Sequence, residues 1–443
     1  MLHLFQQLLP AEFVEQTHNQ AGCRHNNRVY TPLVVMWLMV LQRLNTGASL
    51  ETAVLELVRG LPESFWPRPC KRIRQWREHG QAPSSHTGAY NQARQKLPLL
   101  TVEQSCDRMF EQLVKRMEEK TSGKVSNVFL LDGSSVRAAH SAAMCELYPP
   151  GSNQHGEAHW PLLRILVAHD LRSGLAMRPE WGAMHGPHAV SEQALLERAI
   201  DRLPQGATVM GDANFGVFSV AYAAAQREHP ILLRLTADRA RRLAEKPLQH
   251  GINRMLVWKP SRDERRNHPQ LPADASVRGR LIVRQVRPSN GGAAFLLAIF
   301  TTLPGSPKEV FALYGQRWRI ETDLRTLKST LRLDQLTCST PDMVAKEIEM
   351  GIAAYNLVRA MIVLASEQSG TPPRGYSFTK VRKIAEVFTP ALAAAPNSQA
   401  AQRIFDQMMR CVQQSKLPHR NRKRPSYPRE VWNRGAAFPS RKQ

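Results

Sequence analysis

The spacing of apolar residues changes near residue 124 of the chain. Before that point apolar residues recur at helical spacing, with long stretches at Thr31–Leu44 and Thr101–Lys120, which predicts a mostly helical segment. After it, apolar residues come in short runs bounded by turn residues, of which Ser126–Ser134 is the first. Such runs indicate buried strands. The pattern therefore predicts a helical first part, followed by a part that mixes strands and helices.

The mixed part predicts three strands, then a helix, a strand, a helix and a strand. The expected strands are Ser126–Ser134, Trp160–Asp170, Leu175–Gly182, Ala207–Asp212 and Pro230–Leu235, and the expected helices are Ser191–Leu203 and Val217–His229. A strand meander followed by alternating helices and strands is the element order of an RNase H-like fold. We therefore predict an α/β fold built on an RNase H-like core.

A basic segment interrupts this order between residues 236 and 305. It alternates as strands at Val277–Val286 and Gly291–Phe300, which predicts a β-rich insertion. Later helices are expected at Pro307–Ser329, Pro341–Ser366, Val381–Phe388 and Ser398–Gln414. The expected domains are a helical N-terminal domain at 1–122, the core at 123–366 with its insertion at 236–305, and a helical C-terminal region with a basic tail at 367–443.

The net charge narrows the class of partner. The chain has 60 Lys and Arg against 37 Asp and Glu, a formal charge of +23, which favours a polyanionic partner. Nucleic acid is the commonest such partner, and an anionic membrane is the alternative. The apolar run Leu33–Leu41 is far shorter than the roughly 20 residues of a membrane span, and Asn356 and Arg359 interrupt Gly351–Ala365. Since the N-terminus also lacks the basic start of a signal peptide, we expect nucleic acid as the partner, no membrane and a cytoplasmic location.

Both ends of the chain are candidates for contacts with nucleic acid. The basic, helical N-terminal segment predicts a DNA-binding module or a dimer contact, with a helical cap on the core as the alternative. From Lys416 to Gln443 the chain is rich in Lys, Arg and Pro. This composition predicts an extended arm that contacts phosphates, or a solubilising end.

Three acidic residues are candidates for a shared site. Asp132 and Asp212 each come at the end of an expected strand, and Glu321 lies on a late helix. The first and fourth strands of an RNase H-like sheet are neighbours, so their carboxylates can converge, and the late helix can supply the third. Carboxylate oxygens suit Mg²⁺. Two such ions activate the attacking oxygen and stabilise the leaving oxygen in phosphodiester chemistry.

A polar stripe surrounds the third acid. Tyr314, Arg317, Glu321 and Lys328 lie at offsets of 0, 3, 7 and 14 residues, which on one regular helix fall within an arc of about 60°. A stripe that packs against a core would be apolar. This combination suits a carboxylate that holds a metal ion, flanked by groups that bind phosphate.

These residues resemble the signature of a known family. The chain is similar to DDE transposases of bacterial insertion sequences, in the insertion-sequence-four family, whose pattern is Tyr, two residues, Arg, three residues, Glu, six residues, Lys. Residues Tyr314, Arg317, Glu321 and Lys328 match all four positions and all three gaps. The two aspartates also stand in settings like those of the family's first two acids, and the resemblance covers residues 124 to 360 well.

The resemblance implies a function and a set of roles. Asp132, Asp212 and Glu321 would bind Mg²⁺, with Mn²⁺ as a substitute. The protein would bind the terminal inverted repeats of its element in double-stranded DNA, cut at each end and join the freed 3′-hydroxyl to target DNA, by a cut-and-paste route and as a homodimer. Tyr314 and the two cations, Arg317 and Lys328, would contact DNA phosphates.

Three further expectations concern residues around the site. Several relatives cut the second strand through a DNA hairpin and hold a flipped base against a Trp in the inserted segment. Trp258 is the Trp of the insertion here, and an ordinary strand-core Trp is the alternative. Trp318 is expected to pack the helix. The segment Ala138–His159 is expected to be a long polar loop that could cover the site.

Two rival functions remain from sequence alone. One is a metal-dependent nuclease of the same fold that cuts DNA without joining it, and the other is a DNA-binding relative with an inactive site. The four-residue stripe favours transposition over the first, and the presence of all three acids opposes the second. The chain has no Gly-x-x-x-x-Gly-Lys-Ser/Thr loop, so an ATP-driven accessory is not supported.

Overall fold

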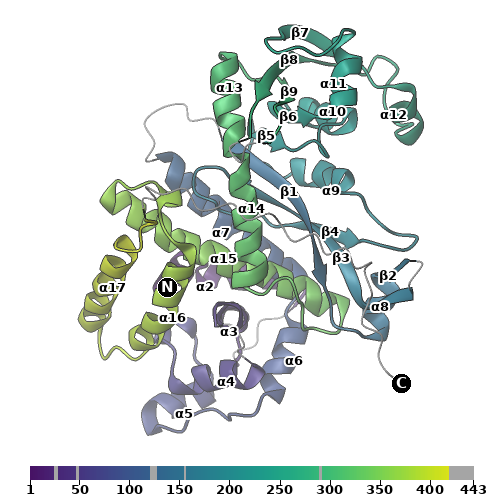
Figure 1. The fold of residues 1–443 in the computed structure, drawn as a ribbon. Coiled ribbons are helices and arrows are strands. Elements are labelled where there is room, and N and C mark those ends of the chain that lie inside the picture. The colour runs from purple at the N-terminus through teal and green to yellow at the C-terminus, as the bar shows by residue number, and fades with distance from the viewer. Residues whose placement is uncertain (24–27, 46–48, 120–126, 154–155, 289–291, 419–443) are drawn as a thin grey trace.

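The structure is a computed structural model that describes residues 1–23, 28–45, 49–119, 127–153, 156–288 and 292–418. It contains one nine-stranded mixed sheet, with helices packed on both faces (Figure 1). The basic arm predicted at Lys416–Gln443 lies almost wholly outside the described residues. The α/β class and the RNase H-like core predicted from the sequence are confirmed.

The sheet has the strand order β2-β3-β1-β5-β6-β9-β8-β7, and β4 pairs with β3. Its central strands β1, β5 and β6 are parallel to one another, whereas β3 and β9 pair antiparallel on either side of them. The first and fourth predicted strands, now β1 and β5, are therefore neighbours, as expected. The strands are β1 (Val128–Arg137), β2 (Pro150–Asn153), β3 (Gly156–Asp170), β4 (Glu180–Ala183), β5 (Thr208–Gly211), β6 (Ile231–Leu235), β7 (Asn253–Trp258), β8 (Val277–Val286) and β9 (Phe295–Thr301).

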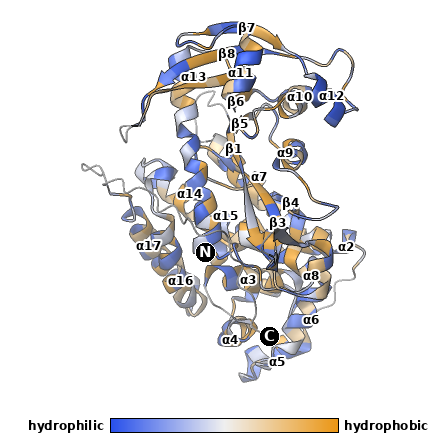
Figure 2. Ribbon diagram, turned by 45° about the vertical axis from the view of Figure 1, so that its right-hand side comes forward, coloured by the Kyte–Doolittle hydropathy of each residue, from blue (hydrophilic) through white to orange (hydrophobic). Residues whose placement is uncertain are grey.

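The β-rich insertion extends the core sheet. Strand β9 pairs with β6 from Leu232↔Thr301 to Leu235↔Ala298, and β8 and β7 follow outward as a meander. Two short helices, α11 (Ala237–Ala244) and α12 (Arg262–Asn267), accompany these strands. Figure 2 shows α12 coloured as strongly hydrophilic, in keeping with its sequence RDERRN. The insertion thus puts a charged end on the same sheet that carries the candidate acids.

Alternating residues of the central strands separate two hydrophobic cores. In β1, Phe129 and Leu131 join the larger core together with Leu195 and Leu196. The intervening residues Val128 and Leu130 join a second core with Met210, Tyr314 and Ile320. The two faces of the sheet follow from the two-residue repeat of a strand. The larger core is covered by helices that include α9 (Glu192–Ile200) and α10 (Phe218–Gln226), and the second core by α13 (Pro307–Tyr314) and α14 (Arg319–Arg325).

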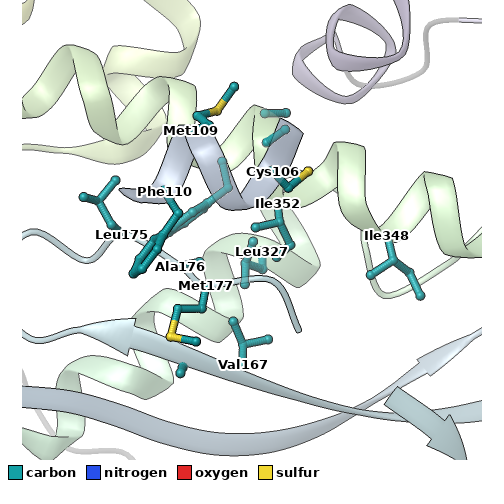
Figure 3. Close-up of a cluster of buried hydrophobic side chains, with 14 of the residues drawn as sticks. Cys106, Met109, Phe110, Val167, Leu175, Ala176, Met177, Leu327, Ile348 and Ile352 are labelled. Atoms are coloured by element: carbon teal, nitrogen blue, oxygen red, sulfur yellow. The ribbon is translucent and has the colours of Figure 1, made fainter. Parts of the chain in front are cut away.

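One long helix, α15 (Pro341–Ser369), joins the terminal helices to the sheet. By length and composition alone it could span a membrane, but 94% of its apolar window is buried inside the protein. Helices α3 (Pro32–Leu44) and α7 (Leu99–Glu119) pack on it. Figure 3 shows Cys106 and Phe110 of α7 close to Ile352 of α15, above Val167 of β3. A long apolar helix that is enclosed in this way is a core helix.

The remaining helices come before the sheet and after α15 in the chain. Those before the sheet are α1 (Leu2–Leu8), α2 (Ala11–Gln20), α4 (Leu50–Arg59), α5 (Lys71–His79) and α6 (Gly88–Lys96). Those after α15 are α16 (Phe378–Ala393) and α17 (Ser398–Gln413). Members of both groups contribute to the same hydrophobic cluster as the sheet.

The segment Ala138–His159 differs from its prediction. It contains the helix α8 (Ala142–Leu147) and the strand β2, and His159 already belongs to β3. Ser141 caps α8, because its hydroxyl accepts a hydrogen bond from the Met144 backbone N–H at 3.3 Å. Strand β2 pairs antiparallel with the start of β3. The expected long polar loop is therefore wrong, since a capped helix and a hairpin order most of it.

Candidate active site

The two candidate aspartates lie side by side on neighbouring parallel strands. The register Val128↔Thr208 and Leu130↔Met210, continued by two residues, sets Asp132 opposite Asp212. Asp212 directly follows β5, but Asp132 lies inside β1, where it pairs with Val167 of β3. The prediction that Asp132 ends its strand is wrong, because β1 continues as a partner of β3 after β5 has stopped.

The surroundings of Asp132 disfavour its charge. Burial raises the pKa of Asp132 to about 6, and the neighbouring Asp212 contributes to the rise, against a hydrogen bond from Gly133 and the positive charge of Arg317. Among the residues that the structure describes, neither aspartate has a Lys, Arg or His within ion-pair distance. Two adjacent carboxylates without a paired cation attract a divalent ion, because like charges at short range cannot both stay ionised cheaply.

Glu321 lies on a helical run of mixed geometry. The run begins as α13, tightens to a 3-10 turn at Gly315–Trp318, returns to α-helix in α14 and widens to a π turn at Thr326–Thr330. The prediction of one regular helix over Pro307–Ser329 is therefore wrong in detail. A 3-10 turn winds more tightly than an α-helix and a π turn less tightly, so the angular offsets that a regular helix gives do not apply along it.

Arg317 links the stripe to the aspartates. Its Nη2 atom lies 3.3 Å from Oε1 of Glu321, and its charge lowers the pKa of both Asp132 and Tyr314. In the described part of the chain, no three His, Cys, Asp or Glu side chains come together closely enough to hold a metal ion. The structure thus brings Asp132 and Asp212 together and pairs Glu321 with Arg317. The donor set is carboxylate oxygen throughout, which fits the preference of Mg²⁺.

Tyr314 and Lys328 are the first and last residues of the stripe. Tyr314 is 7% exposed, and its hydroxyl makes no hydrogen bond of good geometry to the described residues, although Arg317 lies close to it. Burial raises the pKa of Tyr314 to about 12, so the phenol stays protonated at neutral pH. Lys328 donates from Nζ to the Ser134 hydroxyl at 3.0 Å, two residues along β1 from Asp132. The phenol of Tyr314 and the cations of Arg317 and Lys328 can therefore donate hydrogen bonds to anionic oxygens near the aspartates.

A buried ion cluster holds the helix that carries Glu321. Asp323, two residues further on, is fully buried and accepts hydrogen bonds from Arg359 at 2.7 Å and from Arg374 at 2.8 Å. Burial alone would raise the pKa of Asp323, but Arg359, His169 and Arg374 hold it below its ordinary value. Sequence reasoning missed this anchor. The signal was Arg359 in the mostly apolar run Gly351–Ala365 of α15, since a buried cation calls for a buried acid.

Trp258 lies in the core, which was the alternative expected for it, whereas Trp318 lies on the surface, contrary to expectation. Trp258 is 2% exposed and stands edge-on to Phe218 and Phe300, at ring distances of 6.0 and 5.0 Å. Its assignment as a DNA-binding, base-stacking residue is wrong for this structure, because aromatic neighbours already enclose the ring. Trp318 was expected to pack the helix, but it is 60% exposed.

Comparisons with known proteins agree with this arrangement. The family model described as "Transposase DDE domain" matches residues 123–357. Over 360 residues the chain is 24% identical to "Transposase InsG for insertion sequence element IS4" of Escherichia coli (strain K12), and this alignment covers 76% of the present chain and 77% of that protein. The region matched by the family model contains both aspartates and the whole Tyr-Arg-Glu-Lys stripe.

Proposed function

Because this chain belongs to the DDE transposases and is of their insertion-sequence-four type, we propose that it transposes its own element by cut and paste. It would bind the terminal inverted repeats, nick the DNA at each end and join the freed 3′-hydroxyl to target DNA. The observation that carries the proposal is the proximity of Asp132 and Asp212 beyond the last paired residues of β1 and β5, together with Arg317, which acts on Asp132 and pairs with Glu321.

Asp132, Asp212 and Glu321 are proposed to hold two Mg²⁺ ions, with Mn²⁺ as a substitute. When bound, such ions activate the attacking oxygen and stabilise the leaving oxygen of the phosphodiester. The half-buried aspartates Asp132 and Asp212 would hold them beside β1 and β5. The Glu321 carboxylate is paired with Arg317. It would have to separate from Arg317 before it could bind a metal ion. A DNA phosphate offers Arg317 a competing anionic partner, so substrate binding would release Glu321 toward the aspartates.

The other members of the stripe are proposed to position the scissile phosphate. The Tyr314 hydroxyl has spare hydrogen-bonding capacity, since no described residue bonds to it with good geometry. Lys328 is tied to β1 through Ser134. Contacts to phosphate oxygens fix the register of a protein on DNA without reading its sequence. Tyr314, Arg317 and Lys328 would therefore hold the strand end in place while the acids act on it.

The direct test is strand cleavage and joining with purified protein. Duplex DNA that carries the element's ends is incubated with the protein and Mg²⁺, and products are separated by length. We expect nicks at the element ends and strand-transfer products in added target DNA, both lost in EDTA. Cleavage without any joined product would instead favour a nuclease of the same fold.

Glu321→Gln separates an enzyme from a passive DNA-binding protein. The substitution keeps the size of the side chain and removes a proposed metal ligand, so we expect cleavage to fall at least about 100-fold, beyond the effect typical of a mere supporting residue. Binding of end DNA in EDTA should be unchanged. Cleavage at the wild-type rate by this variant would refute the assignment of Glu321.

The proposal also includes partners and place of action. Two element ends must be held together for transposition, so we propose a homodimer in the DNA complex, which the mass of the complex on a sizing column would test. Acting on chromosomal DNA would put the protein in the cytoplasm, at the nucleoid.

A further inference from the structure

Glu192 is an acidic residue beside the aspartate pair that the stripe does not include. It is the first residue of α9, and the hydroxyl of Ser191 caps that helix by accepting from the Ala194 backbone N–H at 3.1 Å. The cap fixes where the helix starts. Helix α9 packs against β1, on the face of the sheet that carries Leu131, whereas α14 covers the opposite face. Glu192 and Glu321 therefore approach β1 from opposite sides.

A glycine makes room for the Glu192 carboxyl group. If Gly133 had a Cβ atom, that atom would lie 2.4 Å from Cδ and 2.5 Å from Oε1 of Glu192. The carboxyl group thus occupies the space of the missing side chain at the residue that follows Asp132. It is close enough for its charge to act on Asp132. Any larger residue at position 133 would force this carboxylate away from the aspartate pair.

Asn214 connects Glu192 with the second aspartate. Its Nδ2 atom donates to Oε2 of Glu192 at 2.5 Å, and its backbone N–H donates to Oδ1 of Asp212 at 2.8 Å. Gln193 fixes the other side of the same amide by donating to Oδ1 of Asn214 at 2.8 Å. The carboxyl groups of Glu192 and Asp212 are therefore held by one asparagine, in a defined orientation.

The negative charge of Glu192 has no balancing cation within the described ranges. No Lys, Arg or His in them lies at ion-pair distance from it, which contrasts with Glu321 and its partner Arg317. An acid in the first turn of a helix is favoured by the helix dipole, and that would account for its position on α9. It does not account for the glycine that leaves room for the carboxyl group, or for the asparagine that hydrogen-bonds to both Glu192 and Asp212.

We propose that Glu192 is a fourth carboxylate of the metal centre, which helps Asp132 and Asp212 to hold the divalent ions. This inference rests on the proposed function, because it assumes that the aspartate pair binds such ions. Glu192 would supply a carboxylate oxygen from the α9 side of β1, and Glu321 would supply one from the α14 side.

Binding of Mn²⁺ to the DNA-free protein tests the inference without measuring activity. Glu192→Gln is compared with wild type by titration calorimetry and by the electron spin resonance of free Mn²⁺. Loss of a supporting carboxylate typically weakens metal binding about 10–100-fold, so we expect the Kd for Mn²⁺ to rise at least tenfold. The matched control is Glu197→Gln, the same substitution further along α9, which should leave the Kd unchanged.

Gly133→Ala provides a second, independent variant. Its methyl group should push the Glu192 carboxyl group aside, so the Kd should rise as in Glu192→Gln, and the double variant should be no weaker than either single one. Thermal unfolding in EDTA shows whether each variant is folded. Wild-type affinity in a folded Glu192→Gln variant would overturn the role of Glu192 alone. Failure of the wild type itself to bind Mn²⁺, with Asp132→Asn no different, would overturn the proposed function as well.

Discussion

At the scale of single residues, Asp132 is an example of a candidate site residue that lowers the stability of the folded protein at neutral pH. Burial, and then the charge of Asp212, raise its pKa to about 6. A carboxyl group whose pKa is raised by folding binds protons more tightly in the folded state, so stability falls as the pH rises from about 4 to about 6. Above that range the folded protein bears the full cost of a partly buried charge that no cation pairs with among the described residues. Such costs are usual at active sites.

Asp132→Asn should therefore stabilise the metal-free protein at neutral to mildly alkaline pH. The expected gain in the free energy of unfolding is on the order of 1–3 kcal/mol, because a difference of one in pKa between the folded and unfolded states corresponds to about 1.4 kcal/mol. The gain should shrink as the pH falls below about 6 and vanish near about 4. Chemical unfolding of both proteins in EDTA across this range measures it. A variant less stable than wild type in mild alkali would contradict the raised pKa.

The two tryptophans predict opposite responses to the same substitution. Trp258→Ala removes a ring enclosed by Phe218 and Phe300 and should lower the free energy of unfolding by about 3–5 kcal/mol. Trp318→Ala, at a side chain that is 60% exposed, should change it by less than about 0.5 kcal/mol. Chemical unfolding followed by circular dichroism distinguishes the two. A loss below about 0.5 kcal/mol for Trp258→Ala would contradict its place in the core.

At the scale of elements, sequence predicted best where one local signal decided the outcome. Strand Val277–Val286 was predicted with its observed bounds, and the cap Ser191 marked the start of α9. The orientation of Trp258 could not be predicted, because Met255 and Val257 make β7 apolar on both faces and yet are exposed at the sheet edge. A two-residue repeat identifies the buried face only when the other face is polar.

The helical run around Glu321 shows a second limit. On a regular helix Trp318 would lie about 40° from the buried Tyr314. The 3-10 turn at Gly315–Trp318 winds at about 120° per residue and carries Trp318 away from the core. No residue of this turn predicts the change in winding. The pairing of Arg317 with Glu321 differs in this respect, because it has the i,i+4 spacing that a regular helix also brings together.

Asp323 anchors this run, so its loss should act on the whole element. Asp323→Asn leaves Arg359 and Arg374 buried without their shared acid and should cost about 3–5 kcal/mol of unfolding free energy. The pKa of Asp323 is lowered by its partners, so its stabilising effect should persist above about pH 4 and fade only below it. Urea unfolding at neutral pH is the measurement. Glu321→Gln, two residues away and 37% exposed, is the control and should cost far less.

At the scale of the whole molecule, the formal charge of +23 is combined with a shape that puts the insertion at one end. Strands β7 to β9 and helices α11 and α12 extend the sheet beyond β6, whereas α16 and α17 lie toward the other end (Figure 1). The strand order leads from the aspartates across β5 and β6 directly into the insertion. A duplex held at the aspartates could therefore run along this end, and cations there should neutralise phosphates that cations on α17 do not reach.

The salt dependence of DNA binding tests this arrangement. Each phosphate neutralised by a cation adds about 0.9 to the slope of log K against log salt. Replacing the exposed Arg242 and Lys259 by Gln should therefore lower the magnitude of the slope by up to about 2, with little change in sequence preference. Lys383 and Arg403, exposed on α16 and α17, form the matched control pair. Fluorescence anisotropy of a labelled end duplex, titrated between about 50 and about 200 mM NaCl, gives both slopes. Should the control pair lower the slope as much as the insertion pair, the charge would act through the general field of the protein, and the insertion would have no special place on the DNA.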